Sequence, residues 1–171
     1  VAVVAAIIAV CLFFFFRGAG GSNYEQPLKD FTAAVNKRDV GAILDTVSLE
    51  AAIEEGTYSD YMMGMDYGDI IDMFESQFQE AFLTQIEEEY GSDFYLECRI
   101  YGAESLSPSE IAELNSDYAS YFGTPSDFIE DAVLVDCDMV ISAGEELESG
   151  NADINVVKVN GRWYIDILAM G

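Results

Sequence analysis

The sequence of 171 residues contains no histidine. This absence removes the usual imidazole ligand of metal ions and every Ser-His or Cys-His pair for nucleophilic catalysis. Enzymes that rely on carboxylate, tyrosine or lysine side chains alone are the catalysts that the composition still allows.

Basic residues are scarce. Lys and Arg total 7 against 32 Asp and Glu, which gives a formal net charge of −25. Such a charge repels the phosphates of nucleic acids and the anionic inner leaflet of a membrane. We therefore expect no nucleic-acid partner, and we interpret the acidic excess as a solvated protein surface.

The chain begins with one long apolar run. Residues 1–16 (VAVVAAIIAVCLFFFF) carry no polar side chain except the Cys11 thiol, and Arg17 ends the run. A helix of this length covers about 24 Å, somewhat less than the ~30 Å hydrocarbon layer of a bilayer. Because the first residue is Val, we expect the span to be truncated at its start. The run predicts a single transmembrane helix.

Two other interpretations of this run stay open. A cleaved signal peptide has an apolar region of similar length, but Arg17 stands where small residues should precede the cleavage site. A filament (pilin-like) subunit assembles through such a helix, but no acidic residue occurs before Glu25. We favour a retained anchor.

The organisation predicted from this anchor has three parts: a transmembrane anchor at 1–17, a flexible spacer at 18–23 (GAGGSN), and one domain at 24–171. We expect a single-pass protein of the plasma membrane with the acidic C-terminal domain outside. Arg17 alone weakly favours the opposite orientation.

Within the domain, helical spacing of apolar residues predicts helices over 24–36, 40–47, 49–55, 68–90 and 107–121. Ser22 or Asn23 is expected to cap the first helix, and Ser107-Pro108-Ser109-Glu110 to open the last. Alternating apolar residues predict strands over 94–101, 132–142, 152–159 and 162–168. The acidic segment 144–151 (GEELESGN) is expected to be a turn, and Asn160-Gly161 is a strong hairpin signal. Helices followed by antiparallel strands predict an α+β fold.

The opening YEQPLKDFTAAVNKRDVGAILDTVS and the closing hairpin NVVKVNGRWYIDI resemble the nuclear-transport-factor-2-like (cystatin-like) superfamily. There, a curved antiparallel sheet wraps around helices as a cone. The chain is most similar to membrane-anchored, uncharacterised extracellular members from Gram-positive bacteria. In those, an amphipathic helix pair, here 24–47, precedes a sheet ending in a hydrophobic-Asn/Asp-Gly-Lys/Arg-Trp-Tyr hairpin, here 159–164. The resemblance implies a cone-like domain on a bacterial cell surface.

The superfamily includes ketosteroid isomerases, dehydratases and many binding or structural members, so the fold alone implies no activity. No residue here matches the isomerase or dehydratase motifs, and we assign no catalytic residue, cofactor or metal ligand. We expect a non-catalytic module that binds or scaffolds a small apolar ligand or another envelope protein. A carboxylate- or tyrosine-based enzyme in the same cone is the alternative, and a filament subunit is the second alternative.

Cys98 and Cys137 both fall on the apolar face of predicted strands. In an oxidising exterior this placement predicts a disulfide bond if the two positions face each other, and otherwise two small buried thiols.

The segment 58–72 (YSDYMMGMDYGDIID) combines Tyr and Met with acidic residues. It favours either an adaptable lid or partner surface, or a helix connection packed onto the open end of the cone. The side chains predicted for the surface are Tyr58, Tyr61, Met62, Met63, Met65 and Tyr67.

Neither Asp60, Asp66 and Asp69 nor Glu145, Glu146 and Glu148 follow the calcium-loop pattern, so we interpret both clusters as solvated charge. Trp163 is expected to be a core anchor of the last strand.

Overall fold

The computed structural model describes residues 23–57 and 65–170. A π-helical turn, Gln79–Leu83, joins two of the helices, and a 3-10 turn, Ile167–Met170, follows the last strand. The elements are α1 (Gln26–Lys37), α2 (Val40–Leu44), α3 (Leu49–Glu55), α4 (Tyr67–Phe78), α5 (Thr84–Tyr90), β1 (Tyr95–Ser105), α6 (Pro108–Phe122), β2 (Asp131–Ala143), β3 (Glu146–Val159) and β4 (Arg162–Ile165).

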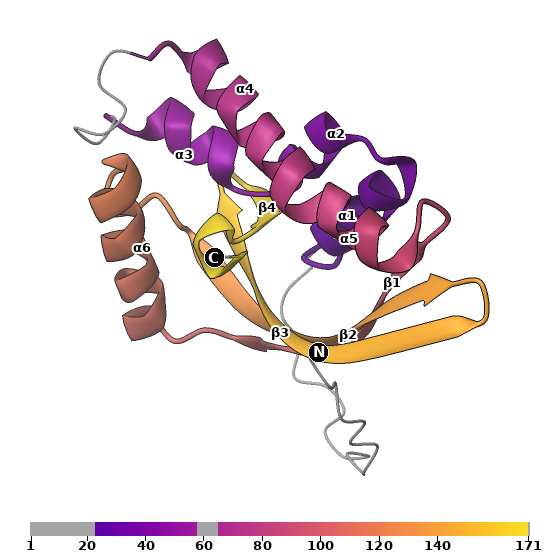
Figure 1. Ribbon diagram of the computed structural model, residues 1–171. Coiled ribbons are helices and arrows are strands. Elements are labelled where there is room, and N and C mark those ends of the chain that lie inside the picture. The colour runs from indigo at the N-terminus through magenta and orange to yellow at the C-terminus, as the bar shows by residue number, and fades with distance from the viewer. Residues whose placement is uncertain (1–22, 58–64, 171) are drawn as a thin grey trace.

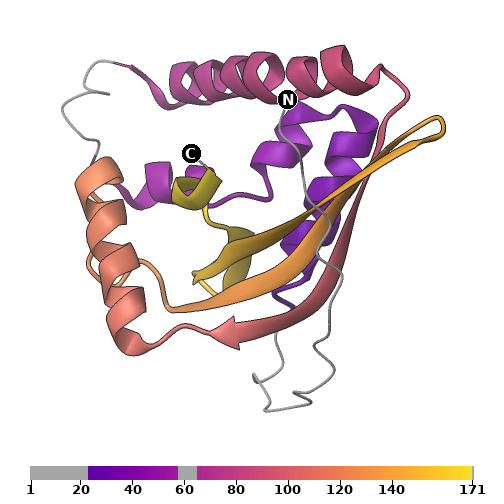
Figure 2. The same ribbon diagram turned by 60° about the horizontal axis from the view of Figure 1, so that its bottom comes forward.

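The four strands form one curved antiparallel sheet in the order β1-β2-β3-β4. Helices α1–α5 lie over its concave side, and α6 stands at one end of the sheet (Figures 1 and 2). This arrangement confirms the predicted α+β fold with helices packed against a curved antiparallel sheet.

The Asn160-Gly161 turn joins β3 to β4 as predicted, with φ angles of 50° and 77° at the two residues. Positive φ at both central positions matches the right-handed twist of the flanking strands. The hairpin signal is therefore confirmed, and it fixes the pairing of Lys158 with Trp163.

The predicted turn at 144–151 is wrong. Only Gly144 and Glu145 form the turn, and Glu146 already pairs with Ala143 as the first residue of β3. The β2–β3 hairpin reaches beyond the helices (Figure 1). Residues 144–149 at its end are exposed, so the side-chain alternation that marks a half-buried strand is missing there.

Some other elements begin or end at residues different from those predicted. The first helix begins at Gln26 after Glu25, whose side chain makes no capping hydrogen bond, so the prediction that Ser22 or Asn23 caps it is wrong. Asn23 instead lies in a turn before the helix, where its carbonyl accepts a hydrogen bond from the Gln26 amide at 3.0 Å. Helix α2 ends at Leu44, and β4 ends at Ile165.

The capping box of α6 is confirmed. The Ser107 hydroxyl accepts a hydrogen bond from the Glu110 amide, and the Glu110 carboxylate accepts one from the Ser107 amide at 2.7 Å. These two bonds satisfy amides that have no partner within the helix, so the local sequence alone sets where α6 begins.

The main core lies between α1 and the concave face of the sheet. Leu28, Phe31 and Val35 of α1 and Val133 and Val135 of β2 are all buried, and they belong to one hydrophobic cluster. Phe82 from the π-helical turn packs on Phe31, with ring centroids 5.9 Å apart. Apolar residues thus fill most of the cone.

Within residues 23–57 and 65–170, no helix combines the length and the apolar character that crossing a membrane requires. The predicted anchor at 1–17 lies outside the residues that the structure describes, and it stays a prediction.

Candidate functional site

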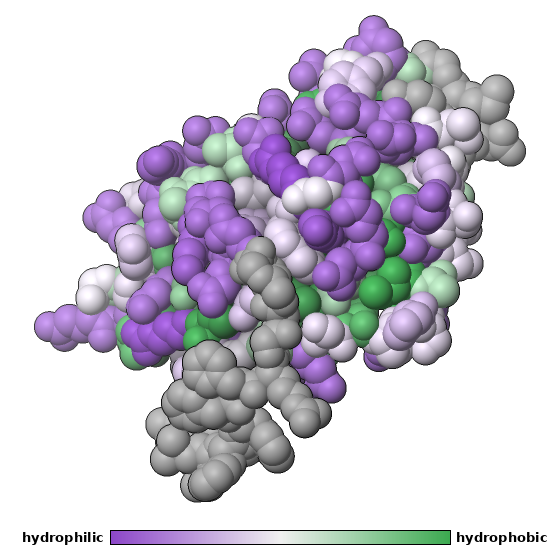
Figure 3. Space-filling view, turned by 180° about the vertical axis from the view of Figure 1, so that it is seen from behind, coloured by the Kyte–Doolittle hydropathy of each residue, from purple (hydrophilic) through white to green (hydrophobic). Residues whose placement is uncertain are grey.

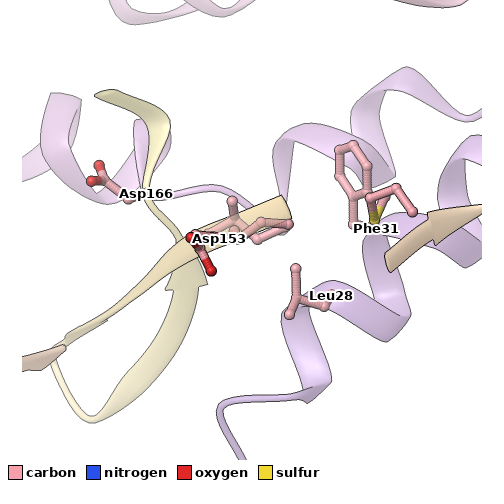
Figure 4. Close-up of a pocket in the computed structure, with 7 residues that line it drawn as sticks. Leu28, Phe31, Asp153 and Asp166 are labelled. Carbon is pink, nitrogen blue, oxygen red and sulfur yellow. The ribbon is translucent and has the colours of Figure 1, made fainter. Parts of the chain in front are cut away.

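One cavity lies inside the cone, between α1 and the sheet (Figure 4). Its volume is about 90 Å³. Most of its wall is apolar, and two carboxyl residues complete it. The lining residues are Leu28, Phe31, Met139, Asp153, Ile154, Ile165 and Asp166.

Asp166 connects this cavity to a buried polar network. The Tyr118 hydroxyl of α6 donates a hydrogen bond to Asp166 Oδ1 at 2.6 Å, and a short hydrogen bond links the same hydroxyl to Ser48 Oγ. All three residues are at most 1% exposed. In Figure 4 the Asp166 carboxylate points away from Leu28 and Phe31.

The backbone after β4 completes the network. The Ile167 amide donates to Ser48 Oγ at 3.1 Å, and the Leu168 amide donates to Asp166 Oδ1 at 3.0 Å. The Ser48 amide donates in turn to the Ile165 carbonyl at 3.0 Å. The network therefore ties the loop before α3, the middle of α6 and the C-terminal segment together.

The electrostatics of this network oppose catalysis by its tyrosine. Burial, followed by the nearby negative charge of Asp166, raises the pKa of Tyr118 well above its usual range. The neutral hydroxyl is therefore strongly favoured, and it serves as a hydrogen-bond donor rather than as a base or nucleophile. Asp166 already accepts two hydrogen bonds, which offset the cost of its burial.

Ser48, Tyr118 and Asp166 were not predicted from the sequence. One signal was available for Asp166, because a carboxylate stands between Ile165 and Ile167 at the end of a buried strand, where it needs a partner. No signal identified its partners, because they lie 48 and 118 residues away along the chain.

The structure brings Cys98 and Cys137 to the same face of the sheet as diagonal neighbours, two residues away from being directly opposite. Cys98 pairs with Met139, and Cys137 pairs with Ile100. Both are free thiols, and the Cys137 thiol donates a hydrogen bond to the Ala152 carbonyl at 3.5 Å. The neighbouring Cys98 sulfur, together with burial, raises the pKa of Cys137.

Diagonal neighbours on antiparallel strands lie roughly 7–8 Å apart, whereas a disulfide usually joins Cα atoms roughly 4.4–6.8 Å apart. A bond between Cys98 and Cys137 therefore requires β1 to shift along β2, and the disulfide stays a prediction. Thiol labelling of the denatured, unreduced chain checks it. Labelling of Cys11 alone would establish the bond.

Most of the predicted Tyr and Met surface lies outside the described residues, namely Tyr58, Tyr61, Met62 and Met63. Met65 and Tyr67 are 40% and 38% exposed at the start of α4. The Tyr67 hydroxyl donates to Glu50 of α3 at 2.8 Å. The role proposed for this segment stays a prediction.

Among the described residues, no group of three or more Cys, Asp or Glu side chains is placed to hold a metal ion. Of the acidic cluster near the β2–β3 turn, Glu148 accepts a hydrogen bond from the Tyr90 hydroxyl at 2.5 Å. That bond raises the pKa of Tyr90 to about 12.

A second, larger hollow lies on the outside of the domain, and we call it the hairpin groove. It has a volume of about 310 Å³ and is formed where the start of α1 and the end of α2 meet the β3–β4 hairpin. Trp163 lines it, so the predicted core anchor is only half-buried. The groove is lined by Asn23, Gln26, Pro27, Asp30, Asp45, Thr46, Gly161, Arg162 and Trp163.

No protein-family model matches this sequence, and neither does any curated protein. Among solved structures, the beta subunit of benzoate 1,2-dioxygenase from Burkholderia mallei aligns with 88% of this chain and 92% of its own. The sequence identity is 10% and the TM-score is 0.45. Because this likeness is low, neither family membership nor function follows from it.

Proposed function

We propose that this chain is a membrane-anchored extracellular module that binds another component of the cell envelope through its outer surface, without catalysing a reaction. The observation that carries the proposal is the filled interior of the cone. The cavity of about 90 Å³ is far below the ~300–1,000 Å³ typical of pockets for drug-sized ligands.

The chemistry of the cavity wall agrees with this proposal. Phe31 and Met139 occupy the space that a ligand in the cone would need. Asp166, the buried carboxylate in the wall, is already engaged by Tyr118 and the Leu168 amide. A general acid or base must exchange a proton with a substrate, whereas the Asp166 carboxylate is bonded to donors inside the protein.

The outer surface offers groups suited to recognition. Tyr95, Tyr101 and Tyr121 are 57%, 62% and 62% exposed. Tyrosine supplies a large, rigid and amphipathic contact area, and it is enriched in protein interfaces. The side of the molecule shown in Figure 3 is mainly hydrophilic, with small hydrophobic patches.

Photocrosslinking in living cells tests this function. We would place the photoreactive amino acid p-benzoylphenylalanine at Tyr101 or Tyr121, and at the cavity position Met139 as the control. We expect discrete adducts with envelope components at the exposed positions and none at Met139. Adducts of a small molecule at Met139, with none at the surface, would contradict the proposal.

The anchor and the outside orientation have a test of their own. The full chain should stay in the membrane fraction after a high-salt wash, and protease added to intact cells should digest the domain. Deleting residues 1–17 should release the domain from the membrane. Protection of the domain in intact cells with digestion after lysis would overturn the orientation.

The enzyme alternative is favoured by one observation, that Asp166 borders the cavity. Asp166→Asn keeps the shape of the side chain and removes the charge. If the cone is catalytic, cells that carry this variant should accumulate the unreacted substrate. If the carboxylate is purely structural, the variant should change only the stability of the domain.

A further inference from the structure

We propose that the hairpin groove binds a neutral saccharide. This inference rests on the proposed function, because it names a ligand class and a site for binding through the outer surface. The groove volume of about 310 Å³ reaches the lower end of the ~300–1,000 Å³ range of small-molecule sites.

The walls of the groove combine one apolar side with polar groups. Trp163 and Pro27 supply the apolar side. Both hydrogen-bond acceptors and donors surround them, with the carboxylates of Asp30 and Asp45 among the acceptors and the guanidinium of Arg162 among the donors. A sugar ring has the same two characters, an apolar face of C–H groups and a rim of hydroxyls that both donate and accept.

The charges in the groove argue against a strongly charged ligand. An anion would meet Asp30 and Asp45, in a chain with a net charge of −25. A cation would meet the guanidinium of Arg162. Hydroxyl groups can bond to charges of both signs without losing a charge–charge interaction, so an uncharged polyhydroxyl ligand is the class that fits.

The aromatic wall is held in position. The Tyr24 ring packs edge-on against Trp163, with ring centroids 6.5 Å apart and an interplanar angle of 75°. Trp163 also sits in a strand position fixed by its pairing with Lys158. A ring held in this way loses little conformational freedom when a ligand binds.

The polar groups are oriented as well. Arg162 Nη2 donates to the Asp45 carbonyl at 3.0 Å, and its guanidinium carbon lies 4.9 Å from the centre of the Tyr164 ring. Asp30 Oδ1 accepts from the Gln26 side-chain amide at 2.8 Å. Among residues 23–57 and 65–170, the Asp45 carboxylate has no hydrogen-bond or ion-pair partner, which leaves it free to accept from a ligand hydroxyl.

The test uses Trp163 as a built-in probe, because it is the only tryptophan of the sequence. The full chain in detergent would be titrated with glucose, galactose, mannose, N-acetylglucosamine and their short oligomers. Charged arms are glucuronic acid and glucosamine. We expect a saturable change of Trp163 fluorescence with at least one neutral sugar, and a weaker or absent response to the charged sugars.

Variants locate the site. Asp45→Ala and Asp30→Ala are surface changes, and each should weaken binding at least 10-fold. Asp117→Ala, an exposed carboxylate on α6, is the matched control and should change the dissociation constant less than 2-fold. Saturation-transfer NMR on the bound sugar gives a second readout that does not depend on Trp163.

Three results would overturn the inference: no response to any neutral sugar at 100 mM, tighter binding of a charged sugar, or an equal loss in Asp117→Ala. Each leaves the proposed function intact if adducts still form at Tyr101 or Tyr121. A lack of surface adducts together with sugar binding would instead contradict binding of an envelope component at Tyr101 or Tyr121, and would still support the hairpin groove as a saccharide site.

Discussion

The buried hydroxyl of Tyr118 has two side-chain hydrogen-bond partners. Its ring packs between Phe122 and Phe128, with centroids 5.8 and 5.2 Å away, while its hydroxyl bonds to Ser48 and Asp166. Leaving a buried carboxylate short of a donor costs more than the bond itself contributes, because the charge loses water without full compensation. This residue therefore links core packing to the position of the C-terminal segment.

Tyr118→Phe removes only the hydroxyl. We expect the free energy of unfolding at pH 7 to fall by about 2 kcal/mol, the usual range for a hydrogen bond to a charged group. Urea unfolding followed by circular dichroism measures this. A loss below about 0.5 kcal/mol would contradict the role given to the network.

The same residue predicts a pH dependence. The pKa of Tyr118 is raised in the folded state above its ordinary value of 10.0, so its contribution to stability is complete below pH 10 and is lost as the pH rises above it. Stability of the native chain should fall there by up to about 1.4 kcal/mol per pH unit from this group, and Tyr118→Phe should lack that part of the slope. Tyr90→Phe, at the surface, is the control and should change the slope much less, because solvent screens its bond to Glu148.

At the scale of elements, the ends of α3 and α6 meet without room for a side chain. A Cβ at Gly56 would lie 2.2 Å from the Phe122 carbonyl oxygen and 2.6 Å from that of Ala52. The Thr57 amide bonds to the Gly123 carbonyl at 3.2 Å, and Gly123 has a φ of 70°. The glycine at 56 is thus needed for close approach, and the glycine at 123 for its left-handed conformation.

Gly56→Ala should destabilise the domain by about 2–3 kcal/mol, because backbone atoms must move to relieve the overlap. Gly102→Ala is the matched control: its added Cβ meets nothing within 4 Å, and the change should stay within about 0.5 kcal/mol. Thermal and urea unfolding of both variants check this. Equal stability of the two would show that α3 and α6 are not packed as described.

Helix α1 is fixed at its end by one cation. Arg38 has a φ of 60°, and its guanidinium bonds to Glu87 of α5 at 3.0 Å and to the Ser92 carbonyl at 2.7 Å. It also lies 3.7 Å from the centre of the Phe94 ring. One of the few basic residues therefore joins α1, α5 and the start of β1, and its role is structural.

At the scale of the whole molecule, negative charge is almost unopposed. Four ion pairs form among the described residues, and their nitrogen–oxygen distances run from 2.6 to 3.9 Å. Such pairs at a surface contribute little, whereas carboxylates that face one another raise the free energy of the compact state. Asp136 and Asp153, directly opposite on β2 and β3, are one such pair.

Added salt should therefore stabilise this protein. Raising NaCl from 20 to 300 mM shortens the range of charge repulsion severalfold. We expect the free energy of unfolding to rise by more than about 1 kcal/mol. Salt weakens the repulsion among the carboxylates more than it weakens the ion pairs, because each pair is worth only about 0–1 kcal/mol. Urea unfolding at each concentration checks it, with sucrose of equal osmolarity as the control. A fall in stability with salt would show that ion pairs outweigh repulsion.

The sequence by itself determined the features that depend on neighbouring residues. Ser107 and Glu110 specify the start of α6, Asn160-Gly161 specifies a hairpin, and apolar spacing specifies helices followed by strands, because each is a local preference of the backbone. The turn predicted at 144–151 was too long, because residues 146–151 pair with β2 although their sequence lacks the alternation of a half-buried strand.

Only the tertiary structure decided which distant groups meet. Ser48, Tyr118 and Asp166 come from three segments, and the hairpin groove joins the start of α1 to Arg162 and Trp163. These contacts depend on the curvature of the sheet and on how α1 and α6 pack against it, and neither is encoded in the spacing of any single segment. The diagonal placement of Cys98 and Cys137 has the same origin, because strand register is set by the whole sheet.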